Sequence, residues 1–257
     1  MNYLRFAVST AALLFGSAGL HAAGPADDMI AKARAFLGTE SALNAIKTIH
    51  YTGTLEFTDR VSSDGDKTKL VDQKINVPIE IHFQKPMQQC VMANSTKVLE
   101  TTALDGYDGW QRRQDAADPT KWQLTLLDKE QIKRLQANTW ENLNFFKGPG
   151  NAGGRVDYLG EARAEGRDCV KLAYVHAPTI IFYRYFDKLT GRLLLTETES
   201  GAMIREEGQM VVNGVRFPKK VVNKGTDGRI TVITFDQVII NETLAPSLFA
   251  VPSLSIK

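Results

Sequence analysis

Two long segments of alternating apolar and polar residues constrain the fold more than any other feature of this chain. They span residues 49–58 and 75–83. Successive side chains of a β-strand point to opposite faces, so a period of two predicts two strands, each with one buried face. The apolar positions that share this face are Ile49, Tyr51, Leu55, Phe57, Ile75, Val77, Ile79, Ile81 and Phe83. Pro78 cannot donate to a strand ladder, so the second strand is expected at a sheet edge or at a bulge.

Shorter segments of the same kind follow along most of the chain. The Asn213-Gly214 pair is the strongest hairpin signal among the turns that separate them. Short strands joined by tight turns indicate a continuous antiparallel meander, and no linker divides it, so residues 24–257 are expected to form a single domain. The further strands are predicted at 88–93, 97–103, 109–114, 155–161, 168–176, 180–187, 192–199, 203–212, 215–223 and 229–240.

Helices are predicted at two places. Apolar residues between Met29 and Leu37 recur at helical spacing, and Gly38 is placed where a left-handed residue often ends a helix. Thr39 is a suitable N-cap for a second short helix. A third helix is expected after Asp128, because Gln131 three residues later completes a capping box. Helices at the amino end and in the middle of the chain can cover the apolar face of the sheet, so the fold class is mainly β with helices on one side.

The amino terminus has the pattern of a secretory signal. Arg5 precedes a short apolar stretch, and small residues lead to Ala22 and Ala23. The stretch is shorter than the ~20 apolar residues that a membrane-spanning helix needs. We therefore expect residues 1–23 to be removed on export to the periplasm. No cysteine stands directly after the apolar stretch, where a lipid would be attached, so the mature protein is expected to be soluble and free of a lipid anchor.

Charge and cysteine content limit the remaining possibilities. The net charge of +2 falls to +1 once Arg5 is removed with the signal, which argues against nucleic acid as a partner. Cys90 and Cys169 are the two cysteines. In an oxidising compartment they could form a disulfide, or they could remain two separate buried thiols; the sequence leaves both open.

No catalytic constellation emerges from the sequence. His50, His82 and His176 are far apart in the chain and form no recognised metal-binding pair, so neither a metal nor another cofactor is expected. His50 and His82 fall on the polar faces of their strands and are expected to be exposed. A secreted enzyme of unrecognised type remains the least favoured hypothesis, with His50 or His82 acting beside Glu80.

Several motifs, in this order and spacing, resemble the outer-membrane lipoprotein carrier superfamily, the LolA- and LolB-like periplasmic lipoprotein-sorting proteins. They are Leu37-Gly38 and the following Ala42–Ile46, the turn at Asp105–Trp110, Asp187–Gly191 followed by three leucines, Asn213–Pro218, and the closing Phe249–Pro252. The resemblance implies an incomplete antiparallel β-barrel, closed on one side by helices, whose interior holds acyl chains. The best-known carriers of this superfamily latch the helical lid with a specific basic residue; the resemblance does not place that residue in this sequence, and neither Arg60 nor Arg112 is assigned the role.

The resemblance implies a non-enzymatic, monomeric carrier of lipid or lipoprotein acyl chains, with envelope membrane proteins as further candidate partners. A protein-interaction or stress-sensor module of the same fold is the alternative. For the acyl chain we predict contacts from the sheet, from the helical cover and from the rim: Leu55, Phe57, Ile79, Ile81, Leu135, Trp140, Phe146 and Trp110. The alternative for each of these side chains is a place in a filled core.

Overall fold

The structure is a computed structural model that describes residues 24–63, 66–150 and 153–252. The predicted export signal, residues 1–23, lies outside the described residues and stays a prediction. No helix in the described ranges is long and apolar enough to cross a membrane.

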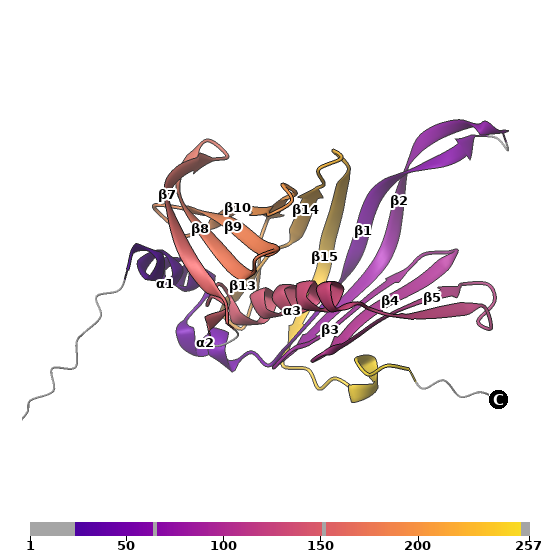
Figure 1. Cartoon of the computed structure of the whole chain (residues 1–257), viewed down its shortest axis with the longest axis horizontal. Coiled ribbons are helices and arrows are strands. Elements are labelled where there is room, and N and C mark those ends of the chain that lie inside the picture. The colour runs from indigo at the N-terminus through magenta and orange to yellow at the C-terminus, as the bar shows by residue number, and fades with distance from the viewer. Residues whose placement is uncertain (1–23, 64–65, 151–152, 253–257) are drawn as a thin grey trace, which may run out of the picture.

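Strands dominate the described chain, as Figure 1 shows. The strands of the amino-terminal half are β1 (Thr48–Ser63), β2 (Asp66–Gln84), β3 (Gln88–Asn94), β4 (Val98–Asp105), β5 (Asp108–Asp115) and β6 (Trp122–Leu126). Those of the carboxy-terminal half are β7 (Arg155–Ala164), β8 (Arg167–Ala177), β9 (Ile180–Asp187), β10 (Leu193–Thr198), β11 (Met203–Glu207), β12 (Met210–Val212), β13 (Val215–Phe217), β14 (Lys220–Lys224) and β15 (Ile230–Ile240).

Thirteen of the described strands form one curved antiparallel sheet in the order β6-β5-β4-β3-β2-β1-β15-β14-β11-β10-β9-β8-β7. Two meanders therefore meet at a central seam, where β1 pairs with β15 and Ile49 lies opposite Ile240. The strands β6 and β7 lie at opposite edges of the sheet, so it does not close into a barrel. The expected fold class, an incomplete antiparallel barrel with helices on one side, is confirmed.

Strand pairing confirms which residues share a face. Tyr51 lies opposite Ile81 on what we call the inner face, the face that the helices cover. His50 lies opposite His82, and His82 lies opposite Cys90, on the outer face. Adjacent residues of the same strand therefore serve opposite sides of the molecule.

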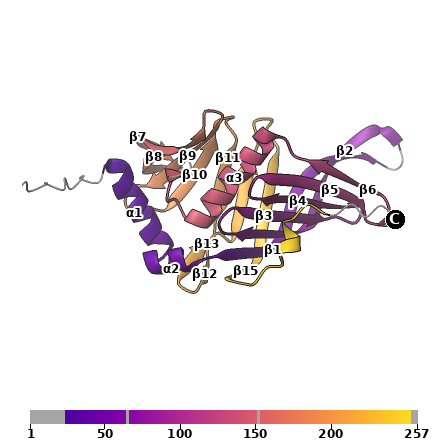
Figure 2. The same ribbon diagram turned by 60° about the horizontal axis from the view of Figure 1, so that its bottom comes forward.

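Three helices cover the inner face: α1 (Pro25–Leu37), α2 (Glu40–Ala45) and α3 (Lys129–Asn144). Figure 2 shows α3 crossing the sheet and α1 beside the carboxy-terminal half. The predicted caps are confirmed, because Thr39 Oγ1 accepts from the backbone N–H of Ala42 and Asp128 forms a reciprocal capping box with Gln131. Gly38 is extended, with φ of 170°, so the left-handed prediction for it is wrong. Glycine fits there because a Cβ would meet the Gly214 carbonyl oxygen at 3.0 Å.

Several predicted strand boundaries differ from the structure. The strand β1 ends at Ser63 and the strand β2 begins at Asp66, so both extend beyond the predicted segments 49–58 and 75–83. The predicted strand 203–212 divides into β11 and β12, the strand 215–223 divides into β13 and β14, and β6 was not predicted. The Asn213-Gly214 hairpin is confirmed, with positive φ values of 48° and 78°.

Pro78 lies where the sheet narrows. It is opposite Thr54 of β1, whereas the ladder between β2 and β3 begins one residue later, at Ile79. The missing N–H therefore faces a side where β2 has no partner strand, as predicted for a local edge.

Both cysteine thiols are free and buried. Cys90 packs on the outer face with Ala103, Trp110 and Phe249. Cys169 lies on β8 in the other half of the sheet, where its thiol donates to the Arg167 carbonyl at 3.3 Å. The structure therefore has two separate buried thiols and not the disulfide.

Candidate functional site: a cavity under helix α3

A cavity of about 300 Å³ lies between the inner face and the carboxy-terminal half of α3. Ile81 and Phe83 of β2 and Val91 of β3 form one wall, because they occupy alternate, inward-facing positions. The opposite wall is formed by strands from the other side of the central seam. Its apolar residues are Phe217, Val221, Ile233 and Phe235.

The lid over this cavity is α3. Asn138, Glu141, Asn142 and Phe145 line the cavity, and their spacing of three and four residues places them on one face of the helix. The helix ends at Asn144, and the next two residues, Phe145 and Phe146, are both left-handed, with φ of 49° and 66°. That conformation is costly for bulky residues, by roughly 1–3 kcal/mol each. It directs both rings into the interior, where each borders the cavity.

A buried arginine fastens the end of the lid. Arg34 of α1 donates from Nη1 to the carbonyls of Asn144 and Phe145, at 2.7 Å each. Its other nitrogens form a two-point ion pair with Glu40, at 2.6 and 2.7 Å. The last carbonyls of a helix have no partner within the helix, so the guanidinium satisfies groups that would otherwise be unpaired. Arg34 therefore connects α1 to the lid.

One wall of the cavity is charged. Glu141 of the lid forms an ion pair with Arg184 of β9 and a 2.6 Å hydrogen bond with His176 Nε2. The Arg184 guanidinium also lies over the rings of Phe146 and Tyr174, at 4.8 and 4.5 Å. Burial alone would raise the pKa of Glu141, but the positive charge of Arg184 and the His176 bond outweigh it and hold that pKa below its usual value.

A second carboxyl group borders the same wall. Glu206 of β11 lines the cavity, and burial raises its pKa even though Arg184 and Arg192 act in the opposite direction. Within the described residues, Arg184 Nε makes no hydrogen bond. An apolar space therefore has, at one end, a set of charged groups whose hydrogen-bonding capacity is not fully used.

Of the predicted acyl-chain contacts, Ile81 and Phe146 line the cavity. Leu55, Phe57 and Ile79 lie on the inner face but do not line the cavity, because they are nearer the tip of the β1–β2 hairpin than Tyr51 and Ile81, which do. The remaining three are Leu135, Trp140 and Trp110, which do not line it.

The tryptophans are held elsewhere by their indole N–H groups. Trp140 donates to the Gly148 carbonyl at 2.9 Å, on another side of α3. Trp110 lies on the outer face and not at the rim, and it donates to the Phe249 carbonyl at 2.8 Å. The segment after β15, which includes the 3-10 helix η2 (Pro246–Leu248), covers Trp110 there.

Sequence reasoning missed the charged residues of the site, namely Arg34, Glu141, Arg184 and Glu206. For Arg184 a signal exists: it is the single charge in the apolar and aromatic stretch 180–186. Long charged residues are rarely buried without a partner, so this arginine indicated an interior carboxylate. No comparable pattern marks the other three.

The histidines of the outer face also differ from expectation. His82 is buried, with 5% of its surface exposed, and the His50 side chain is 14% exposed. The expectation that both are solvent-exposed is therefore wrong. The structure does bring His50, Glu80 and His82 together, as the enzyme hypothesis required.

Comparison with known proteins identifies the fold. No family model matches the sequence, and no curated protein matches it. Among solved structures, a LolA superfamily protein from Nitrosomonas europaea is similar at 13% identity and a TM-score of 0.54, over 89% of this chain and 98% of that chain. A DUF1329 family protein from Desulfovibrio piger is similar at 11% identity and a TM-score of 0.54, over 89% and 98%.

A third structure is an outer membrane lipoprotein-sorting protein domain from Vibrio parahaemolyticus, at 10% identity and a TM-score of 0.53, over 87% of this chain and 97% of that chain. The similarity extends across nearly the whole length of each of these proteins. At such low identity it establishes the architecture and nothing finer. The chain therefore has the LolA-like fold, with its cavity in the space between the curved sheet and the helices.

Proposed function

We propose that this chain is a non-enzymatic carrier or binding protein of the cell envelope that shields an acyl chain of a lipid or lipoprotein in the cavity under α3. The observation that carries the proposal is the cavity itself, an apolar space under a helical lid in a LolA-like fold. The export pattern at residues 1–23 supports a periplasmic location. The lipoprotein-sorting domain with the same architecture supports this class of ligand.

The energetics favour such a ligand. Each methylene removed from water contributes about 0.8 kcal/mol, so exposing a long chain in an aqueous compartment is costly. The volume of about 300 Å³ is at the lower end of the ~300–1,000 Å³ of typical ligand sites. A long acyl chain would therefore require the lid to move, and the contacts of Arg34 with Asn144 and Phe145 are among those that hold the lid in place, together with the pair of Glu141 and Arg184.

The charged wall suits an amphipathic ligand. Arg184 and Glu206 border the same space as the phenylalanines, so a polar headgroup could hydrogen-bond at that end while the chain lies along the apolar wall. A filled, dry interior would instead favour the alternative of a protein-interaction or sensor module. The cavity is the feature that favours the carrier.

Fluorescent fatty-acid binding to the delipidated protein tests the proposal. Ile81→Glu places a charge in the apolar wall, so we expect binding to fall by more than about 100-fold, because an unpaired buried charge is strongly unfavourable. Ile230→Glu is the matched control, since Ile230 is 51% exposed and does not line the cavity. It should bind like the wild type.

A second variant keeps the test decisive if Ile81→Glu fails to fold. Val91→Phe adds volume to the cavity wall without adding charge, so it should reduce binding roughly 10-fold and leave the stability nearly unchanged. Native mass spectrometry of protein taken from the cell envelope should show a bound acyl-containing species. Wild-type affinity in both folded wall variants, or no fatty-acid binding by the wild type, would refute the proposal.

A further inference from the structure

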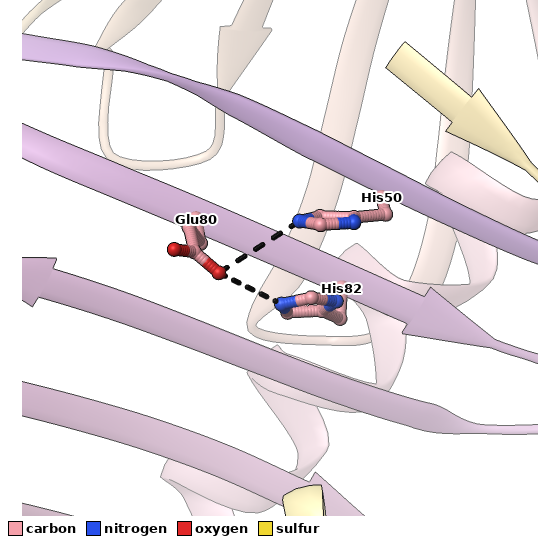
Figure 3. Close-up of side chains that lie close together, drawn as sticks. All are labelled: His50, Glu80 and His82. Atoms are coloured by element: carbon pink, nitrogen blue, oxygen red, sulfur yellow. Dashed lines mark ion pairs between the residues drawn. The ribbon is translucent and has the colours of Figure 1, made fainter. Parts of the chain in front are cut away.

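Three metal-ligating side chains converge on the outer face, on the side of the sheet opposite the cavity. His50 of β1 and His82 of β2 are directly opposite in the ladder, and Glu80 is two residues before His82 on the same face. Figure 3 shows Glu80 Oε2 directed at both rings. It lies 3.8 Å from His50 Nε2 and 3.5 Å from His82 Nε2, and one ligand atom from each residue falls within 4.8 Å of the others.

A fourth residue determines which nitrogen of His50 faces this group. Glu242, just after β15, accepts a 2.9 Å hydrogen bond from His50 Nδ1. A neutral imidazole that donates from Nδ1 has its lone pair on Nε2. That lone pair is turned toward Glu80, and His50 Nε2 makes no hydrogen bond with any described residue.

The ring nitrogens of His82 also lack hydrogen bonds to any described residue, and this side chain is more deeply buried than that of His50. The His82 side chain is only 7% exposed, and neither ring nitrogen has a hydrogen-bond partner in the described part of the chain. Buried polar atoms almost always have partners, and an exception points to an ion or water at that place.

We propose that His50 Nε2, His82 Nε2 and the Glu80 carboxylate bind one divalent first-row transition-metal ion, with Glu242 positioning the His50 ring. Two imidazoles and a carboxylate are preferred by Zn²⁺ and related ions, whereas Ca²⁺ and Mg²⁺ prefer oxygen ligands. Tetrahedral bonds of 2.0–2.1 Å separate neighbouring ligand atoms by about 3.4 Å, close to the 3.5 and 3.8 Å seen here.

Binding requires a small rearrangement of the rings. They are stacked, with centroids 4.0 Å apart and planes inclined at 23°, so they must tilt toward each other for both lone pairs to reach one ion. The Glu80 side chain is 45% exposed, which gives the ion a route from solvent and leaves room for water as a further ligand. The ion would connect β1 to β2 and, through Glu242, to the segment that follows β15.

Metal titration of the exported protein, without an affinity tag and after treatment with a chelator, tests the proposal. We expect Zn²⁺ to bind at one ion per chain in competition with a chromophoric chelator, and Co²⁺ to give the visible spectrum of a site containing nitrogen ligands. His82→Ala should weaken Zn²⁺ binding by more than about 100-fold, and Glu242→Gln by about 10-fold to 100-fold, as for other residues that orient a ligand.

Two controls distinguish binding at this site from binding elsewhere on the protein. Glu56→Gln removes an outer-face carboxylate of β1 that pairs with Lys74, and it should bind Zn²⁺ like the wild type. Should His82→Ala not fold, the ring NMR signals of the wild type decide: Zn²⁺ must shift His50 and His82 and leave His176 unchanged. No binding of Zn²⁺ or Co²⁺ refutes the proposal, and so does binding that survives in the His50→Ala/His82→Ala double variant.

Discussion

The two faces of the central sheet differ in how their buried polar groups are satisfied. On the inner face, Glu141 and Arg184 are buried together and neutralise each other under the lid. On the outer face, directly behind the cavity wall, the His82 nitrogens are buried without a hydrogen-bond partner among the described residues. Ile81 and His82 are consecutive residues of β2, so this strand contributes one side chain to the cavity wall and the next to the outer-face group.

This difference shows how the cover of a sheet determines what its surface can do. Three helices cover the inner face, which leaves an enclosed space large enough for a ligand. On the outer face, the segment after β15 covers the cluster of Cys90, Trp110 and Phe249. The outer face also holds the compact polar group of His50, Glu80 and His82, of which only the Glu80 side chain is substantially exposed, and this group suits a small ion better than an acyl chain.

The largest expected effect tests whether the inner charges depend on their pairing. Glu141→Gln leaves Arg184 charged and buried without its main partner, so the free energy of unfolding should fall by about 3–5 kcal/mol. Because the pKa of Glu141 is lowered in the folded state, its stabilisation is present above the ordinary pKa of glutamate and is lost as the pH falls through the folded-state value. Urea unfolding of the wild type and the variant from pH 7 to pH 3 measures both the loss of unfolding free energy and its dependence on pH.

The control for this substitution is Glu130→Gln. Glu130 forms an exposed pair with Lys133, and such pairs contribute about 0–1 kcal/mol. If Glu141→Gln and Glu130→Gln lowered the free energy of unfolding by the same small amount, the ion pair of Glu141 and Arg184 would be hydrated. The inner face would then not hold a buried, mutually neutralised pair.

The next effect tests whether the outer cover is independent of the cavity. Phe249→Ala removes a fully buried ring from the cluster with Cys90 and Trp110, so thermal unfolding should report a loss of about 3 kcal/mol. Fatty-acid binding should be unchanged, because Phe249 is on the other side of the sheet from the cavity. Val251→Ala, at a 40% exposed position of the same segment, should have little effect. Reduced fatty-acid affinity in the Phe249 variant would show that the faces are coupled.

The smallest effect concerns the carboxyl whose pKa is raised. Glu206→Gln removes a charge that burial disfavours, so the variant should be more stable than the wild type at pH 7, by about 1 kcal/mol. A raised pKa in the folded state means that the wild type loses stability as the pH rises from ~4.3, the ordinary glutamate value. Urea titrations at pH 4 and pH 7 should therefore show the difference only at the higher pH. A variant less stable than the wild type at pH 7 would instead assign Glu206 to a favourable pair with Arg184 or Arg192.

The sequence predicted what local patterns determine. Alternation over residues 49–58 and 75–83 specified both strands and their inner faces, because a slip of one residue would have exposed every apolar side chain. The caps at Thr39 and Asp128 and the hairpin at Asn213-Gly214 involve residues only a few positions apart, and each is confirmed.

The rest depends on contacts between distant segments. Trp110 is the one large apolar residue in the stretch 108–115, so alternation could not show which face it occupies; that face is determined by pairing with Ala103 and by the cover of Phe249. His50 and His82 were expected on a solvated surface, and their stacking follows from strand register, which sequence spacing alone does not reveal. The pairing of Arg34 with the end of α3 involves residues 110 and 111 positions apart.

The seam between β1 and β15 has a consequence for how the protein is made. The first and last strands of the sheet are adjacent at its centre, and the cavity has walls on both sides of this seam. A chain that is synthesised from its amino terminus therefore exposes the apolar face of its first meander until β15 is made. Pairing over such a long sequence separation is slow, so the new chain is most vulnerable to aggregation and proteolysis in the interval before its last strand docks.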